Sequence, residues 1–288
     1  MSQLTILVGV ILIYFLYKAL RKKDFSWSHV AKNENPKRPK DHLSVLYKET
    51  VGLASLQENP ILFLSDAIES ENDAEAYSHH VVQEILEYLD LPYSSIRINY
   101  SVKNDPPKVT MNSIHGFDFQ IPADLKQSKG ALQSLLAYEC VRIFMAYQRS
   151  EFALRVKEHH LNDYAAIYSG LGVIFLKHLE ELLDLLRHIE PEFSFYTNIN
   201  DLMFVMAVYL FQKDLTPDYL QGRLDTYYTR RITREYRQLI KTPYEIIYKD
   251  AFDANIRCHK CFQISRVPAG RKMVVTCPNC KNQFDIRT

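Results

Sequence analysis

The sequence predicts an α+β protein in which helices outnumber a small sheet. Apolar residues recur at helical spacing over residues 80–89 and 126–147, and nearly all of residues 162–240 have helical character. Between the first two helices, residues 96–102 alternate strictly between apolar and polar, which is the period of a half-buried strand. Short segments at 108–111 and 116–121 also have strand character. Strands grouped in one part of a largely helical chain are typical of the α+β class.

The length and charge of the chain limit its organisation. Its 288 residues, 47% of them apolar, are enough for about two domains with a substantial core. The net charge of +1 excludes a uniformly basic nucleic-acid binder and a strongly acidic protein. The charge is uneven, however, because residues 1–40 and 254–288 carry +6 each and the middle carries −11. We expect an anchor over 1–23, a linker over 24–42, a helical domain over 43–253 and a basic terminal segment.

Residues 4–20 are almost wholly apolar and predict a single transmembrane helix. Seventeen residues make about 25 Å of helix, just enough to cross a hydrocarbon core. A secretory signal peptide would carry cations before the apolar run, whereas here they lie at or beyond its far end. A helix buried in the fold or lying in the membrane interface would need a polar face, and this segment has none, so both alternatives are disfavoured. Because flanking cations stay in the cytoplasm, we expect an inner-membrane protein with its N-terminus outside and its bulk cytoplasmic.

The terminal segment contains two Cys-x-x-Cys motifs, formed by Cys258 with Cys261 and by Cys277 with Cys280. Fifteen residues separate the motifs, a spacing typical of four-thiolate zinc sites. Residues 262–267 and 272–276 have strand character and are joined by Pro-Ala-Gly, so we expect a β-hairpin that brings the motifs together. The segment resembles the zinc ribbons at the termini of many bacterial proteins. Four thiolates leave no open coordination position, so one structural zinc ion per chain is expected. Two disulfides are the alternative, which a reducing compartment disfavours.

The helix predicted over residues 126–147 and the strand before it carry a family resemblance. The passage FDFQIPADLKQSKGALQSLLAYECVRIFMAYQ resembles zincin-type metallopeptidases, in which an edge strand precedes the helix bearing His-Glu-x-x-His. Downstream, LNDYAAIYSGLGVIFL resembles the helix that often follows in bacterial peptidase-like proteins, where an acidic residue near the start is a third metal ligand. The resemblance covers residues 93–180 and implies a mostly helical, zincin-like domain.

The residues aligned with His-Glu-x-x-His are Tyr138-Glu139-Cys140-Val141-Arg142, so this chain retains only the glutamate. In a zincin the two histidines bind zinc and the glutamate polarises the attacking water. Tyr138 is a poor zinc ligand, and the permanent charge of Arg142 would repel a metal ion. We expect an ion pair between Arg142 and Glu139, Glu158 or Asp163 instead. An ordinary buried helix without enzymatic ancestry is the alternative interpretation. In either case Cys140 is predicted to fill the core.

These features predict a membrane-anchored pseudo-metallopeptidase that acts as a binding or adaptor protein for a protein partner, with a structural zinc ribbon and no catalytic residue. An active membrane-bound zinc metallopeptidase stays open as an alternative. It would use unusual ligands drawn from His159, His160, Asp163 and Glu139, with Glu139 as its catalytic residue. The remaining histidines are expected at the surface or at the edge of the core. We find no Gly-rich phosphate loop, dinucleotide fingerprint or Ser/His/Asp signal.

A second alternative is a nucleic-acid-binding membrane protein. One predicted helix contains a run of cations interleaved with tyrosines, a combination that can contact phosphates and stack on bases. The cations are Arg223, Arg230, Arg231, Arg234, Arg237 and Lys241. A solvated helix face is the commoner explanation of such a run. In a domain of charge −11, pairing with acidic neighbours or use as a docking surface is expected.

Overall fold

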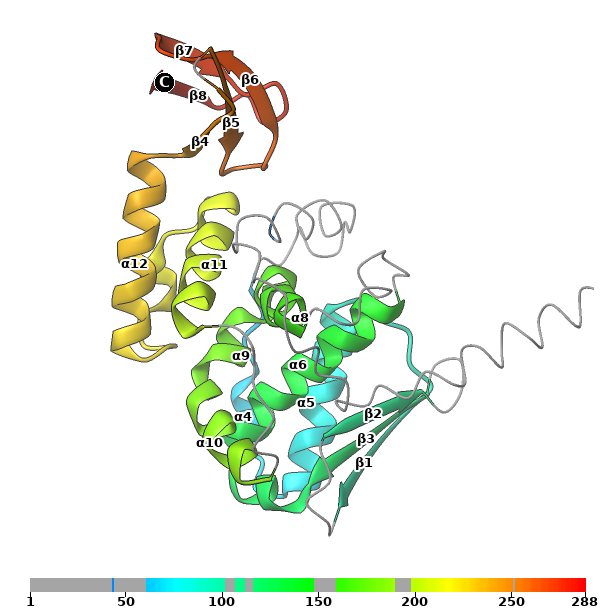
Figure 1. Ribbon diagram of the computed structural model, residues 1–288. Helices are drawn as coiled ribbons and strands as arrows, with labels where there is room; N and C mark the ends of the chain where they lie inside the picture. Colours follow the sequence, from blue (N-terminus) through cyan, green and yellow to red (C-terminus); the bar gives the residue numbers. More distant parts are fainter. Residues whose placement is uncertain are drawn as a thin grey trace, which may run out of the picture.

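The computed structural model describes residue 43 and residues 61–101, 107–111, 116–147, 159–189, 198–250 and 252–288. The predicted transmembrane segment, residues 4–20, and the predicted linker, residues 24–42, lie outside these ranges. Of the helices that are described, none has the length and apolar character needed to cross a bilayer. The described chain is a mixed α and β structure, which confirms the predicted class (Figure 1).

Helices dominate the part of the chain between residues 66 and 241. The helices are α4 (Asp66–Ser70), α5 (Ala74–Tyr88), the 3-10 helix η1 (Ala123–Gln127), α6 (Lys129–Tyr147), α8 (His159–Ala166), the π-helix η2 (Ile167–Leu171), α9 (Gly172–Lys177), α10 (Leu179–Ile189), α11 (Ile199–Gln212), the 3-10 helix η3 (Pro217–Leu220) and α12 (Thr226–Lys241). The strands form three small sheets: β1 (Ser95–Ser101), β2 (Lys108–Met111) and β3 (Gly116–Pro122); β4 (Tyr244–Tyr248), β5 (Asp253–Cys258) and β6 (Ile264–Pro268); and β7 (Lys272–Thr276) with β8 (Gln283–Arg287).

The first sheet has the strand order β1-β3-β2, with β1 parallel and β2 antiparallel to β3. Its central strand places Phe117, Phe119 and Ile121 on one buried face, as the period of two requires. Figure 1 shows this sheet on one side of α5 and α6, with α9 and α10 on the other side. The hydroxyl of Tyr100 on β1 bonds to the Ser78 hydroxyl of α5 at 2.8 Å, which fixes that helix against the sheet.

Helix α5 begins six residues before the residue 80 predicted from hydrophobic spacing. Its N-cap is Asp73, whose carboxylate accepts a hydrogen bond from the amide of Ala76 at 2.8 Å. Of residues 74–79, only Tyr77 is large and apolar, so this part of the helix contributes little to the apolar period. The cap, rather than the period, thus determines where this helix starts.

Helix α6 is the centre of the helical domain. Every residue from Ala131 to Val141 is buried, including the polar side chains of Gln133, Ser134 and Glu139. A helix that is buried on all sides must be surrounded by other elements, and α6 packs against α5, α8, α9 and α10. Cys140 is fully buried among them, which confirms its predicted position in the core.

The helix after α6 is interrupted, because Gly170 has a positive φ of 87° within the π-helix η2. This conformation is open to glycine at little steric cost. The Gly170 carbonyl accepts a hydrogen bond from the amide of Leu62 at 3.0 Å, so the earlier chain segment reaches the bulge. Gly172 follows, and a Cβ built there would lie 2.8 Å from the sulfur of Met206 on α11. The two glycines therefore allow the bend and the close approach of α11.

The C-terminal strands differ from the predicted hairpin. Strands β6 and β7 occupy almost the predicted positions but do not pair with each other, because β6 pairs with β5 and β7 pairs with β8. Each Cys-x-x-Cys motif is itself the turn of a hairpin, so the expected pairing across Pro-Ala-Gly was wrong. Strand β4 also joins the sheet, with Tyr244 opposite Cys258.

Candidate metal centre

The four C-terminal cysteines converge on one point. The Cys258 and Cys280 sulfurs are 3.5 Å apart, and those of Cys261 and Cys277 are 3.4 Å apart. All four sulfurs lie within 4.8 Å of one another. A disulfide would hold two sulfurs at about 2.05 Å, whereas a tetrahedral zinc ion with bonds of about 2.3 Å holds its sulfurs about 3.8 Å apart. The four thiols are free, and their spacing fits a tetrahedral metal ion.

The two motifs have the same backbone structure. In each, the carbonyl of the first cysteine accepts from the amide four residues later, and its amide donates to the carbonyl five residues later. The bonds are Phe262 N to Cys258 O (2.8 Å), Lys281 N to Cys277 O (3.0 Å), Cys258 N to Gln263 O (3.0 Å) and Cys277 N to Asn282 O (2.8 Å). The residue after the second cysteine is left-handed in both, with φ of 55° at Phe262 and 62° at Lys281.

Left-handed backbone is unfavourable for non-glycine residues, by about 1–2 kcal/mol each. Here the same strained position occurs in both motifs, directly after the second cysteine. The resulting turn places both sulfurs of a motif on the same side of the chain. Repeated strain at a constellation of metal-ligand side chains is typical of a functional site. The sequence spacing predicts the four ligands but carries no signal for these left-handed residues.

The thiols of the cluster have different proton affinities. Burial raises the pKa of Cys258 and that of Cys280 above their usual range. Burial also acts to raise the pKa of Cys277, but hydrogen bonds from the backbone of Cys280 and Asn279 outweigh it and lower that pKa. A thiol with a raised pKa binds a metal as the thiolate only if the cation displaces its proton. A soft divalent ion such as zinc could displace these protons, since four sulfur ligands favour it over hard cations.

The first cysteine motif is attached to the helical domain. The side-chain amide of Gln212, at the end of α11, donates to the carbonyl of His259 at 3.0 Å. Its oxygen accepts from the Tyr168 hydroxyl of η2 at 2.5 Å. Lys260 forms an ion pair with Asp214. The four-cysteine cluster is therefore held against the end of α11 and linked through Gln212 to the π-helix.

A second cluster of polar side chains lies between α6 and α8. The Arg142 guanidinium donates to both carboxylate oxygens of Glu139, at 2.9 and 3.0 Å, which confirms that one of the expected ion pairs forms. Glu139 and Asp163 are only 2% and 1% exposed. Burial raises the pKa of Glu139, although the charge of Arg142 acts to lower it.

Tyr138, the residue aligned with the first zincin ligand, also belongs to this cluster. Its ring stacks on Phe175 of α9 with the centroids 6.1 Å apart. Burial raises the pKa of Tyr138 well above its usual range, and the negative charge of Asp163 raises it further. A hydrogen bond with Asn162 acts in the opposite direction. The structure thus brings Asn162 and Asp163 of α8 to the aligned face of α6.

The expected alternative metal site can be placed only in part. Glu139 and Asp163 lie on neighbouring helices, whereas the side chains of His159, His160 and Glu158 lie outside those described. Within the described part of the chain, the four cysteines make up the one group of His, Cys, Asp and Glu side chains close enough to hold a metal. Comparison of the chain with family models, curated proteins and solved structures finds no match. The zincin-like resemblance therefore stays a prediction.

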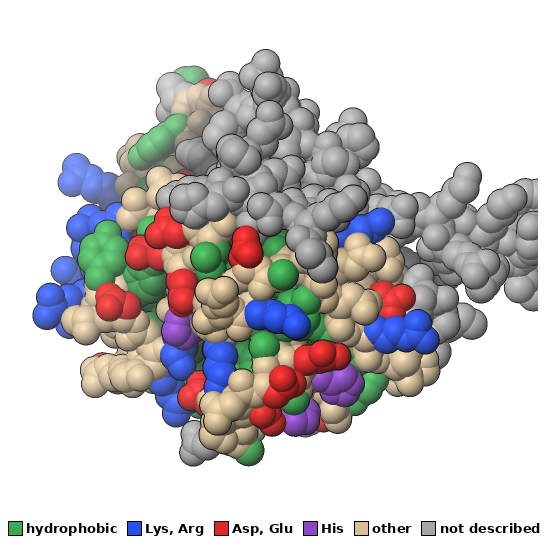
Figure 2. Space-filling model, turned by 90° about the horizontal axis from the view of Figure 1, so that it is seen from below, with side chains coloured by type: hydrophobic (Ala, Val, Ile, Leu, Met, Phe, Trp, Pro, Cys, Tyr) green, Lys and Arg blue, Asp and Glu red, His purple; other side chains and the backbone are tan. Residues whose placement is uncertain are grey.

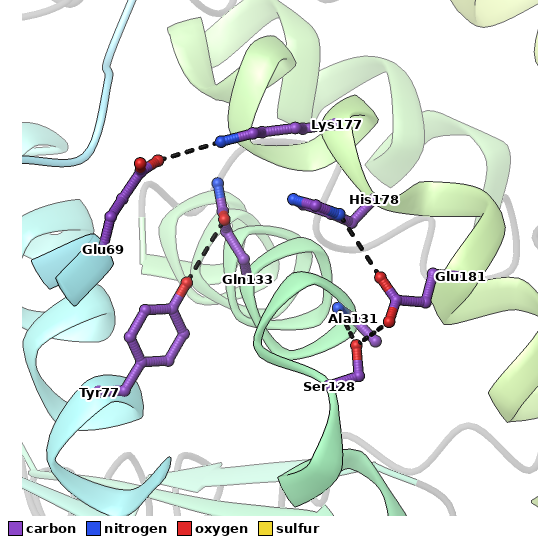
Figure 3. A network of polar contacts seen from close by, with 8 residues as sticks. All are labelled: Glu69, Tyr77, Ser128, Ala131, Gln133, Lys177, His178 and Glu181. Atoms are coloured by element: carbon purple, nitrogen blue, oxygen red, sulfur yellow. Dashed lines mark hydrogen bonds and ion pairs between the residues drawn. The ribbon is translucent and has the colours of Figure 1, made fainter. Parts of the chain in front are cut away.

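A third polar network joins the start of α6 to α10 (Figure 3). The Glu181 carboxylate accepts from the hydroxyl of Ser128, and its other oxygen lies 3.5 Å from Nδ1 of His178. Ser128 also caps α6, because its oxygen accepts from the Ala131 amide at 3.0 Å. Ser128 contacts the carboxylate rather than the imidazole, so the three side chains do not have the order of a nucleophilic triad. The network holds the two helices together, and His178 is half-buried at the edge of the core, as predicted.

Proposed function

We propose that this chain is a membrane-anchored binding protein in which a pseudo-metallopeptidase domain is joined to a structural zinc ribbon. The ion pair between Arg142 and Glu139 is the main support. A zincin would carry a zinc-binding histidine at position 142, and here a guanidinium lies 2.9 Å from the retained glutamate. This guanidinium repels a metal ion and engages the carboxylate that would polarise water. Burial of the pair inside the helical domain favours a structural role.

The proposed role of the zinc ion is structural. Four thiolates complete its tetrahedron, so no position is open to water or to a substrate. Each Cys-x-x-Cys motif is the turn of a separate hairpin, and one ion would cross-link the two hairpins into a single ribbon. Four thiolates around one Zn²⁺ also leave about two negative charges, which offset part of the +6 of residues 254–288.

The membrane anchor in this proposal is supported by the sequence of residues 4–20 and by the cations that follow it. It would hold the helical domain and the ribbon at the cytoplasmic face of the inner membrane. A reporter fused after Thr288 tests this orientation. A fluorescent protein that matures only in the cytoplasm should fluoresce, and an alkaline phosphatase that folds only after export should be inactive. An active phosphatase would overturn the orientation.

Metal counting tests the zinc ribbon and the pseudoenzyme together. The full chain is purified in detergent and its metal content is measured by mass spectrometry. We expect one zinc ion per chain. Cys258→Ser and Cys277→Ser should each lose that zinc. Cys140→Ala is the matched control, because Cys140 is free and buried outside the cluster, and this variant should keep the metal.

Two results would contradict the proposal in different ways. A chain that binds no zinc would remove the ribbon. A chain with two zinc ions, one of which survives Cys277→Ser, would favour the active metallopeptidase. In that case Glu139→Gln should abolish proteolysis of a casein substrate, because the general base would be lost.

A further inference from the structure

Helix α12 presents a row of unshielded cations to solvent. We name this row the basic face, and it consists of Arg230, Arg234, Arg237 and Lys241. Successive members are three or four residues apart, so they lie on one side of the helix. The row extends for about 16 Å along the helix axis. Figure 2 shows Lys and Arg side chains gathered at the left edge of the molecule, the side on which α12 lies in Figure 1.

Within the described residues, the pairing with acidic neighbours expected for the cation run forms at Arg231 but not at the basic face. Among the described residues, the helix has one ion pair, between Arg231 and Glu235 at 3.6 Å, and Arg231 is not part of the basic face. Arg223 is also engaged elsewhere, with its guanidinium 3.7 Å from the centre of the Phe63 ring. The four cations of the basic face have no carboxylate partner in the described part of the chain. No carboxylate of the described residues therefore offsets their mutual repulsion.

The opposite side of α12 is already used in packing. Tyr228, Ile232 and Leu239 are buried, and Tyr236 packs edge-on against Phe211 of α11 with ring centroids 6.3 Å apart. Ile240 stays 56% exposed, but a single aliphatic side chain is not an apolar face that could enter a lipid bilayer. What the helix mainly offers to a partner is charge, together with one aromatic ring. That ring belongs to Tyr227, which is 59% exposed and precedes Arg230 by one helical turn.

We propose that the basic face of α12 binds single-stranded nucleic acid, with the cations on the phosphates and Tyr227 stacked on a base. Three of the four cations are arginines, and the planar guanidinium forms paired hydrogen bonds with phosphate oxygens. An anionic membrane attracts lysine and arginine almost equally, so it would not favour arginine. A narrow row of cations matches a linear polyanion better than a plane. An exposed tyrosine beside arginines is the usual stacking element for unpaired bases.

This inference names the ligand of the proposed binding protein and rests on that proposed role. The two can fail separately, because the metal count reports on the cysteines and the basic face contains none of them. The probe is a fluorescein-labelled oligothymidylate, titrated with the full chain in a zwitterionic detergent and followed by fluorescence anisotropy. Four phosphate contacts predict that the logarithm of affinity falls with the logarithm of salt concentration with a slope of about −3.

Charge-neutralising variants locate the binding surface. Arg234→Gln with Arg237→Gln should weaken binding roughly tenfold and reduce the slope by about 1.4. The matched control is Arg271→Gln with Lys272→Gln, which removes the same charge from two exposed ribbon residues and should leave the slope unchanged. Tyr227→Ala should weaken binding without changing the slope, because stacking releases no counterions. Zinc content and circular dichroism verify that each variant is folded.

Three outcomes would overturn the proposal. One is the absence of oligonucleotide binding at low salt. Another is an equal loss of affinity in the α12 variant and in the ribbon control, which would assign binding to net charge. The third is binding to nanodiscs that contain phosphatidylserine, with no binding to the oligonucleotide, which would assign the basic face to the membrane surface.

Discussion

The buried ion pair between Glu139 and Arg142 should be strongly coupled. Its side chains are 3% and 10% exposed, and the guanidinium meets both carboxylate oxygens within 3.0 Å. Removing one partner of such a pair leaves a buried charge and costs about 3–5 kcal/mol. Arginine keeps its proton under all ordinary conditions. Glu139→Leu should therefore lower the free energy of unfolding by about 3–5 kcal/mol above the raised pKa of Glu139, where the pair is formed, and by less below it, where the carboxyl is already protonated.

The loss of stability caused by the partner substitution, Arg142→Met, should depend on pH. In Arg142→Met the carboxylate of Glu139 loses its counter-ion, and burial then raises its pKa further above the usual 4.5. The folded state then keeps a proton that the unfolded state releases, so stability is fully present below pH 4.5 and falls as pH rises through the folded pKa. At neutral pH we expect a loss of a size similar to that of Glu139→Leu.

The double variant Glu139→Leu with Arg142→Met decides whether the pair acts as a unit. Replacing both charges by apolar side chains is often neutral, so the double variant should be more stable than either single one. Urea unfolding of the zinc-loaded chain in detergent, followed by circular dichroism, measures the three values. The control pair is Lys177 with Glu69, 3.1 Å apart but 34% and 45% exposed, where Lys177→Met should cost at most about 1 kcal/mol. Losses that simply add for Glu139 and Arg142 would refute the reasoning.

Three further outcomes are expected. Gly130→Ala should destabilise the domain by about 1–3 kcal/mol in the same assay, because its Cβ would lie 2.4 Å from the His178 ring; an unchanged midpoint would contradict this close approach. Gln212→Ala should release zinc to a chelator about fivefold faster, since it removes a hydrogen bond to the first cysteine motif. Gln221→Ala, which removes only a bond to an exposed Asp218, is its control. Burial lowers the pKa of His178 below 6.5, so stability present above pH 6.5 should be lost as pH falls, and His178→Phe should flatten that part of the pH profile.

Local patterns were sufficient for several predictions. Strand β2 has the predicted bounds, Lys108–Met111, and β1 and β3 differ from theirs by one residue. The ion pair of Arg142 with Glu139 joins residues three apart on one helix, so helix geometry alone brings them together. The four cysteines were predictable because each Cys-x-x-Cys motif is a local turn with both sulfurs on one side.

Long-range pairing was beyond the reach of these patterns. The sequence predicts strands at residues 262–267 and 272–276, close to β6 and β7, but their partners depend on which hydrogen bonds the whole ribbon satisfies. Both Cys-x-x-Cys motifs are hairpin turns in the structure. The contact between Gln212 and the carbonyl of His259 joins residues 47 apart and has no sequence signal. The hydrogen-bond partner of a single polar side chain at this separation depends on how the domains pack.

The sequence by itself determined the fold class, the four metal-ligand candidates and the cations of α12, since each depends on residue type and short spacing. Only the tertiary structure decided which side of α12 is covered. It buries Tyr228, Ile232 and Leu239 against the domain and leaves the four cations of the basic face in solvent without carboxylate partners in the described part of the chain. The reason is physical: periodicity says which residues share a face, whereas exposure and pairing depend on what packs against that face.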